Sequence, residues 1–276
     1  MQSRFIFPAI AGMVALAALV SQAIHSPARA ETAPAPAATP TTPVDAEACK
    51  ACHGPQGISK SAGIPNLAGQ KAGYLENQLK AFRAKDRKNA FMNAIAGQLS
   101  DDDIRQLALY WSSLPATPVA ADGVQQAEAG PPFPSRMTLP AGFPAGFTVY
   151  QTETGDGAIT KRYANTIAWN AAKAGQPLPE GSVLFQVNYK LEKDAKGQDV
   201  AGAVTGYTGM ESRAGWGAAF PVLLRNGDWD YAAFGPDGAR RDQLNQAVCL
   251  ACHKPQEANS YVFTLDTLRA AARREK

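Results

Sequence analysis

Cys49-Lys50-Ala51-Cys52-His53 and Cys249-Leu250-Ala251-Cys252-His253 share one five-residue pattern, and together they contain every cysteine of this 276-residue chain. In a c-type haem attachment, the two thiols bond to the vinyl groups of the haem, and the adjacent histidine is an axial ligand of the iron. The spacing therefore predicts two covalently bound c-type haems. The predicted attachment residues are Cys49, Cys52, Cys249 and Cys252, and the predicted iron ligands are His53 and His253.

Zinc sites and thioredoxin-like redox pairs also use the Cys-x-x-Cys spacing. The chain has three histidines, His25, His53 and His253, so neither motif is followed by the His-x-x-x-His of a zinc finger. No βαβ pattern of the thioredoxin kind surrounds either motif. Four cysteines as zinc ligands are the remaining alternative. A histidine directly follows both cysteine pairs, which favours haem attachment.

The N-terminus predicts export. Arg4 precedes an apolar run from Phe5 to Val20, and Ala28-Arg29-Ala30 offers a small-x-small cleavage site. Because the run is shorter than the ~20 residues that span a bilayer, we expect residues 1–30 to be a signal peptide cleaved near Ala30, with an uncleaved anchor as the alternative. Bacteria attach c-type haem outside the cytoplasm, so the expected location is the periplasm. Cleavage would also remove His25.

The charge of the chain argues against nucleic acid as a partner. The formal net charge is +3, and Arg4 and Arg29 of the expected leader contribute two of these charges. The mature chain is therefore close to neutral, whereas nucleic-acid-binding domains are usually basic.

Composition divides the exported chain into two predicted domains. Residues 31–44, rich in Ala, Pro and Thr, are expected to form a flexible linker, and residues 115–135 a second linker. Residues 45–114 form so small a domain that a buried haem would supply much of its core. Residues 136–276 are numerous enough to bury a core of their own.

Helical patterns dominate residues 45–114. Asp45 can cap a helix that runs into the first motif, and apolar residues recur at helical spacing over residues 75–82. Ser100 can open a further helix, with Asp103 in the position that glutamate takes in a capping box. Met92 lies between these two helices in a stretch without a strong helical period. Its thioether could reach the iron face opposite the first motif, although a lone methionine is more often a core residue.

The first domain resembles the short class I bacterial cytochromes c. The matching segments are Cys49 to Gly54, Pro65 to Gln70, Tyr74-Leu75, Phe82-Arg83, Met92 and Leu99 to Pro115. The resemblance implies a fold of three to four helices, His53 and Met92 as axial ligands, and a Pro65 carbonyl that orients the histidine ring. With both axial positions filled, the iron is expected to transfer single electrons at a relatively high potential.

Strand patterns dominate residues 136–276. Residues 183–192 alternate between apolar and polar, and short β-like runs occur at residues 147–150, 204–207 and 229–234. One helix is expected from an Asn165 cap to a Gly175 stop. The four-helix cytochromes c′ also carry a C-terminal haem motif, but they need long amphipathic helices that this sequence lacks. The predicted fold class is therefore α+β with two domains: a small all-α class I cytochrome c domain, then a β-rich antiparallel-sheet haem domain.

The second domain resembles the cytochrome P-460 family. The matching segments are Lys161–Asn165, Pro179–Val183, Met210–Arg213, Gly227–Tyr231, Cys249–His253 and Val262–Thr264, in the family's order. The resemblance implies a β-rich, often dimeric domain with a five-coordinate haem. The family includes hydroxylamine-oxidising enzymes and the cytochromes c′-beta, which bind nitric oxide and similar gases.

One departure from this family concerns a lysine that its enzymes cross-link to the haem, because Gln186 stands at that position here. Lys190 follows on the same strand face, but it lies ~13 Å further along the strand and is expected to be a solvated edge lysine. Met137 and Met210 are the other methionines of the mature chain, and Met210 is expected to be a core residue. We therefore expect an open sixth position at the second haem.

Two classes of function follow. As an enzyme, the second haem would convert a small nitrogen species such as hydroxylamine or nitric oxide and pass electrons through the first haem to a soluble or membrane-bound periplasmic partner. As a non-enzymatic cytochrome, the chain would carry electrons or bind gas, and the missing lysine favours this class. A dihaem peroxidase is a third possibility, but the chain shows no resemblance to that family. No catalytic residue is assigned, since Glu211 and Asp228 are expected to be solvated. A homodimer through the second domain is also expected.

Overall fold

The computed structural model describes residues 43, 45–116 and 133–274. The expected signal peptide and most of both expected linkers lie outside these residues, so their boundaries stay predictions. Within the described part, no helix is both long enough and apolar enough to cross a membrane.

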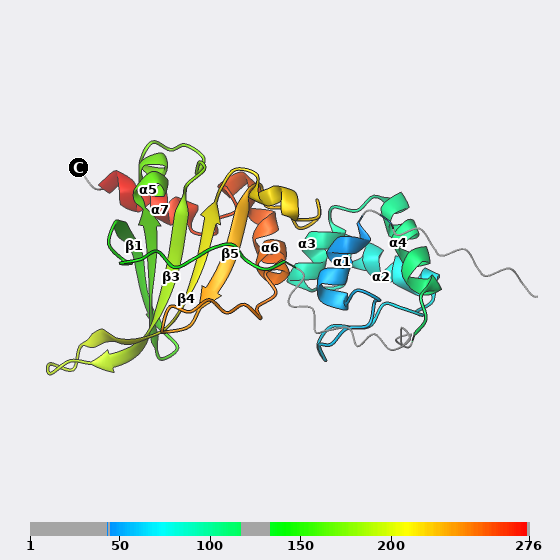
Figure 1. Cartoon of the computed structure of the whole chain (residues 1–276), viewed down its shortest axis with the longest axis horizontal. Coiled ribbons are helices and arrows are strands. Elements are labelled where there is room, and N and C mark those ends of the chain that lie inside the picture. The colour runs from blue at the N-terminus through cyan, green and yellow to red at the C-terminus, as the bar shows by residue number, and fades with distance from the viewer. Residues whose placement is uncertain (1–42, 44, 117–132, 275–276) are drawn as a thin grey trace, which may run out of the picture. The chain divides into compact units, whose positions relative to one another are not determined.

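Four helices build the first domain: α1 (Ala46–His53), α2 (Ala72–Ala84), α3 (Ala90–Ala96) and α4 (Asp101–Ser113) (Figure 1). Helix α2 packs against both α3 and α4. The predicted helical fold is therefore confirmed. Asp45 stands at the N-cap position of α1, but its side chain makes no capping hydrogen bond.

Helix α4 begins with the predicted capping box. The Ser100 hydroxyl accepts the Asp103 N–H at 3.2 Å, and the Asp103 carboxylate accepts the Ser100 N–H at 2.8 Å, so two otherwise unpaired donors are satisfied. One face of α4 then buries Ile104, Leu107 and Trp111 against the rest of the domain. Because proline cannot continue a helix, the chain leaves α4 just before Pro115.

Helix α3 contains Met92, which lies in a stretch where the sequence shows no strong helical period. The side chain of Asn89 accepts the Met92 N–H at 3.0 Å and caps this seven-residue helix. Its sequence is almost entirely apolar, with Asn93 as the one polar residue, so it lacks the alternation of apolar and polar positions that would show a helical period.

Five strands form one antiparallel sheet in the second domain, each paired with the next in chain order. They are β1 (Phe147–Gly155), β2 (Ala158–Asn165), β3 (Val183–Lys193), β4 (Asp199–Ser212) and β5 (Trp229–Phe234). The helices are α5 (Thr166–Lys173), α6 (Ala247–His253) and α7 (Leu265–Arg274), with short 3-10 turns η1 (Trp216–Ala219) and η2 (Lys254–Asn259). The β-rich antiparallel domain is confirmed. Helix α5 is capped by Asn165, which accepts the Ala168 N–H at 3.0 Å, and ends before Gly175 as predicted.

Strand β3 is the centre of this sheet, which corrects the expectation that Lys190 lies at an edge. The Lys190 side chain is nevertheless exposed. The first half of β3 is buried on both faces, since Leu184 and Phe185 are 4% and 2% exposed. The sequence suggested a single apolar face because a polar residue, Gln186, follows them on one side.

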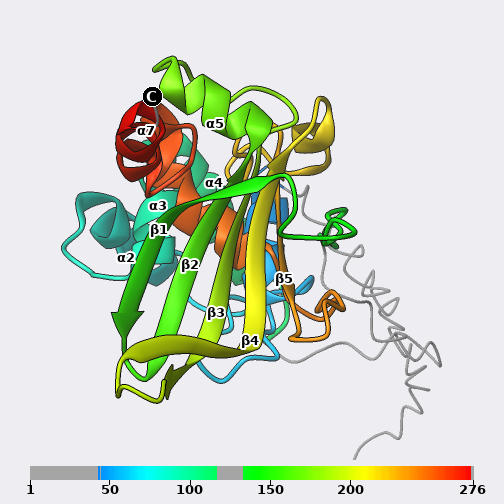
Figure 2. The ribbon, with the colours of Figure 1, turned by 90° about the vertical axis from the view of Figure 1, so that its left-hand side faces the viewer.

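The two faces of the sheet have different neighbours. On one face, Phe185 packs with Met137, Phe143 and Tyr163. Gly209 of β4 lies opposite Phe185 in the register, and a Cβ atom on it would come within 2.5 Å of the Phe185 ring. The absence of a side chain at this position therefore leaves room for the ring to pack over β4. Helices α6 and α7 lie behind the other face (Figure 2).

The segment that enters the second domain is fixed to β5 by one buried carboxylate. Asp230 is fully buried and accepts hydrogen bonds from the Ser135 hydroxyl at 2.7 Å, the Arg136 Nε at 2.8 Å and the Arg136 backbone N–H at 3.2 Å. A charge so deeply buried needs such partners. This contact positions the chain on the face opposite the helices.

Candidate haem-binding sites

The first motif occupies the end of α1. Cys49 and Cys52 are partly exposed and three residues apart, so one helix face presents both thiols. Burial raises the pKa of the Cys49 thiol to about 12, against the lowering effect of the nearby Trp111 indole, and raises the pKa of the Cys52 thiol as well.

The imidazole of His53 is oriented by a backbone carbonyl. Its Nδ1 lies 2.7 Å from the oxygen of Pro65, and the ring is 6% exposed. Burial lowers the pKa of His53, and the Pro65 hydrogen bond acts in the opposite direction. If the neutral ring donates from Nδ1, its Nε2 keeps a free lone pair, which is the form that binds iron. The predicted Pro65 contact is confirmed.

Met92 lies on α3 with a half-buried side chain. The segment around it is held by Asn93, whose amide donates to the carbonyls of Phe82 at 2.6 Å and Arg87 at 2.8 Å. The Asn89 N–H in turn donates to the Asn93 side chain at 2.9 Å. Neither asparagine was predicted from the sequence as a site residue. The one signal for them in the sequence was that Asn89 and Asn93 flank a short apolar run, residues 90–92.

The indole N–H of Trp111 is the polar group of the first domain that needs a further partner. It is buried, and within the described part of the chain its neighbour is the Cys49 sulfur, which is only a weak acceptor. Buried donors are normally satisfied. An acceptor group on a haem attached to the first motif would satisfy this one, so the site fits the cofactor.

The second motif occupies α6 and repeats the arrangement of the first. The Nδ1 of His253 lies 2.7 Å from the carbonyl oxygen of Tyr261, and burial lowers the pKa of the ring. Burial also raises the pKa of the Cys249 thiol to about 11. Ser260 and Tyr261 both have left-handed backbone conformations, with φ of 53° and 61°, in the turn that presents this carbonyl. Nothing in the sequence marked Tyr261 for this role.

Two aromatic rings flank the His253 imidazole. The Tyr231 ring centroid lies 4.8 Å from that of the imidazole, and the Phe263 centroid lies 4.9 Å away in an edge-on arrangement. Tyr231 is itself fixed, because the fully buried Asn226 amide donates to its hydroxyl at 3.1 Å. These contacts hold the ring plane of the histidine in one orientation.

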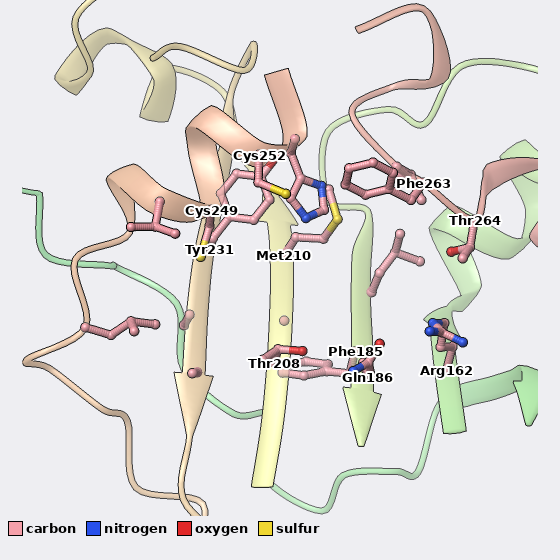
Figure 3. A pocket seen from close by; sticks show the side chains of 18 of the residues that line it. Arg162, Phe185, Gln186, Thr208, Met210, Tyr231, Cys249, Cys252, Phe263 and Thr264 are labelled. Atoms are coloured by element: carbon pink, nitrogen blue, oxygen red, sulfur yellow. The ribbon is translucent and has the colours of Figure 1, made fainter. Parts of the chain in front are cut away.

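A cavity of about 540 Å³ lies beside the second motif (Figure 3). Its wall on the sheet side has two rows of cross-strand neighbours, because alternate residues of paired strands share a face. One row contains Leu184, Met210 and Tyr231, and the next contains Arg162, Gln186 and Thr208. The volume is within the roughly 300–1,000 Å³ of cofactor pockets. Cys249, Cys252 and His253 line the same cavity, so these residues fit a covalently attached haem.

The structure places the remaining candidate residues as follows. Gln186 lines the cavity, whereas Lys190 does not. Met210 lines it at the end that holds Cys252 (Figure 3), and Met137 is buried on the opposite sheet face. Neither of the other methionines of the second domain therefore stands across the cavity from the histidine motif.

The two acidic candidates lie outside the cavity. Asp228 is half-buried and accepts the Gly217 N–H at 3.0 Å. Glu211 was expected to be solvated, but it is 6% exposed and pairs with Arg213. Strand alternation explains the burial, because Glu211 follows the cavity-lining Met210 and faces the other way. No three His, Cys, Asp or Glu side chains of the described residues gather into a metal site.

Two family models match the chain: cytochrome c over residues 42–115 and cytochrome P460 over residues 140–264. Cytochrome c-554(548) of Halomonas halodenitrificans is 47% identical over 68 residues, which are 24% of this chain and 82% of that protein. A thiosulfate dehydrogenase electron acceptor of Stutzerimonas stutzeri is 41% identical over 86 residues, 31% of this chain and 40% of that protein.

Among solved structures, cytochrome c4 of Acidithiobacillus ferrooxidans is 39% identical, with a TM-score of 0.23 over 24% of this chain and 38% of the other. These two matches therefore cover less than half of the length of the electron acceptor and of cytochrome c4. The domain matches, the two Cys-x-x-Cys-His motifs and the site geometry lead to one conclusion. The chain belongs to the cytochrome c family and is a dihaem c-type cytochrome, with a cytochrome c domain followed by a cytochrome P460 domain.

Proposed function

We propose that the first domain is an electron-transfer module whose haem iron is held by His53 and Met92. The imidazole of His53, oriented by the Pro65 carbonyl, and the Asn93-anchored turn that carries Met92 support this assignment. A relative named as the electron acceptor of thiosulfate dehydrogenase supports the same role. Haem supplies one-electron chemistry, and a methionine ligand raises its potential.

We further propose that the second domain binds or redox-converts a small nitrogen species, such as hydroxylamine or nitric oxide, at a haem held by His253. The observation that carries this proposal is the one-sided placement of ligand side chains in the cavity. The Tyr261 carbonyl and two aromatic rings fix His253, and Met210 lies at the end of the cavity that holds Cys252 (Figure 3). The residues at the other end, Arg162, Gln186 and Thr208, are of types that do not usually ligate haem iron.

Gln186 supports a second candidate function, a gas-binding or electron-carrying cytochrome without enzymatic activity. Its amide lines the cavity, where the enzymes of the P460 family have a cross-linking lysine, and an amide cannot form that bond. We also propose that the chain is exported to the periplasm, where its electrons pass to a soluble or membrane-bound partner. We also propose that the chain forms a homodimer through its second domain.

Carbon monoxide tests the open position directly. The reduced wild-type protein should bind one equivalent of carbon monoxide per two haems, measured by absorbance titration. Met92→Ala should raise this to two equivalents, because it removes one ligand of the first iron. Replacing Cys249 and Cys252 together by alanine should abolish binding while leaving the first haem. No binding, or two equivalents in the wild type, contradicts the proposal.

Two further measurements separate enzyme from carrier. Intact mass should equal the mature chain plus two haems, and an ordinary reduced c-type spectrum should accompany it. Steady-state hydroxylamine oxidation with an added electron acceptor then distinguishes the functions. Turnover that disappears with the second haem supports the enzyme, and its absence in a protein that binds carbon monoxide supports the gas-binding cytochrome.

A further inference from the structure

Three polar side chains form one continuous row across the wall of the second cavity. Arg162 of β2 pairs with Gln186 of β3, and Gln186 pairs with Thr208 of β4. Direct neighbours on adjacent strands are about 5 Å apart and point to the same side. All three therefore project into the same end of the cavity, and all three line it.

This row lies away from the histidine motif. It is two residues further along each strand than the row that contains Leu184 and Met210, a displacement of about 7 Å. Figure 3 shows Met210, Cys252 and Phe263 toward one end of the cavity and Thr208, Gln186 and Arg162 toward the other. The cavity thus has a polar end facing the end where His253 is held.

These side chains have hydrogen-bonding capacity that the protein leaves unused. In the described part of the chain, the Thr208 hydroxyl has no hydrogen bond, and the Gln186 amide makes one long contact of 3.4 Å to Asn188. Arg162 pairs through Nη1 with Glu153 at 2.7 Å. The second terminal nitrogen of the guanidinium is left to bind a ligand.

We propose that this row recognises a nitrogen oxide anion, with nitrite as the probe, at the second haem. The inference rests on the proposed open position and adds the ligand class. A guanidinium, an amide and a hydroxyl donate hydrogen bonds to oxygen atoms, and the positive charge favours an anion over neutral hydroxylamine. Charge-assisted bonds inside a cavity are stronger than bonds between neutral groups.

Glu153 provides an internal check on the charge argument. Its carboxylate is 52% exposed and partly offsets the Arg162 charge. Replacing it with glutamine should increase the attraction of the guanidinium for an anion. Glu153→Gln is therefore expected to strengthen nitrite binding, in the direction opposite to loss of Arg162.

Lys161 supplies a matched control. It precedes Arg162 on β2 and faces the other side of the sheet, where its Nζ lies over the Tyr189 ring. Lys161→Met and Arg162→Met remove the same charge from adjacent positions. Only the second change removes a donor from the cavity.

The experiment measures nitrite affinity of the oxidised holoprotein by absorbance, per second haem, in the wild type and these variants. We expect Arg162→Met to weaken binding by about 10- to 100-fold, Gln186→Leu to weaken it less, and Lys161→Met to leave it within about twofold. The carbon monoxide complex supplies a second readout, since Arg162→Met should shift the C–O stretching frequency.

Three outcomes would overturn the inference: a wild type that binds carbon monoxide but not nitrite, equal affinities in Arg162→Met and Lys161→Met, or an affinity loss fully explained by loss of haem from Arg162→Met. The last outcome would assign the arginine to haem retention. Failure of the wild type to bind carbon monoxide would instead refute the open position of the proposed function, so the two failures are distinguishable.

Discussion

Asp230→Ala should be among the most destabilising single changes in the second domain. The carboxylate is fully buried and accepts three hydrogen bonds, two from Arg136 and one from Ser135. Removing one partner of a buried ion pair costs about 3–5 kcal/mol. The Arg136 side chain is 34% exposed and can regain water, so we expect the lower end, about 3 kcal/mol.

Hydrogen exchange read by mass spectrometry suits this test, because unfolding of a two-domain chain is not a single transition. Protection of the peptides covering β5 and residues 133–139 should fall in Asp230→Ala. Asp199→Ala is the control, since its ion pair with Lys193 is exposed and worth at most about 1 kcal/mol. If the two variants lost protection equally, the buried carboxylate would not hold this segment and the reasoning would be wrong.

Three smaller predictions follow from individual contacts. Asp103→Ala should cost about 1 kcal/mol of α4 stability at neutral pH. Hydrogen bonds from the capping serine hold the pKa of the Asp103 carboxyl below its ordinary 3.8. In acid-unfolding curves, the stability difference between wild type and variant should therefore vanish as pH falls through that lowered pKa. Gly209→Val should lower the free energy of unfolding by about 3 kcal/mol, because its Cβ would lie 2.5 Å from Phe185; a wild-type melting temperature would contradict this. Tyr231→Phe should cost about 1–2 kcal/mol in urea unfolding, because one N–H of the buried Asn226 amide loses its acceptor while the other still donates to the Leu250 carbonyl. The haem spectrum should stay unchanged because the ring remains, and an altered spectrum would show that the hydroxyl acts on the haem.

Local signals in the sequence predicted the elements that they control. The Ser100 capping box and the Asn165 cap both form in the structure, because such caps depend on residues three positions apart. Helix α3 could not be delimited from the sequence, because its almost entirely apolar residues show no helical period. Strand β2 was missed as a strand because Lys161 and Arg162 interrupt its apolar pattern, although the family resemblance identified the same segment.

Among the site residues outside the two motifs, some had a signal in the sequence and others had none. The contact between Pro65 and His53 was anticipated from a family pattern, and the structure confirms it. Its counterpart at the second site, the Tyr261 carbonyl, had no signal, because any residue can present a carbonyl and only the backbone path decides which one does. Glu211 was misjudged because the face of a strand on which a charge lies depends on register.

The sequence by itself determined the cofactor chemistry, since haem attachment needs two thiols and a histidine within five residues, and this is a local covalent requirement. It also determined that the two domains differ, because helical and strand periods are written in neighbouring residues. Only the tertiary structure decided what surrounds each histidine. Arg162, Gln186 and Thr208 are far apart along the chain and become one row through the pairing of three strands. That pairing is set by long-range packing and register, which no short stretch of sequence specifies.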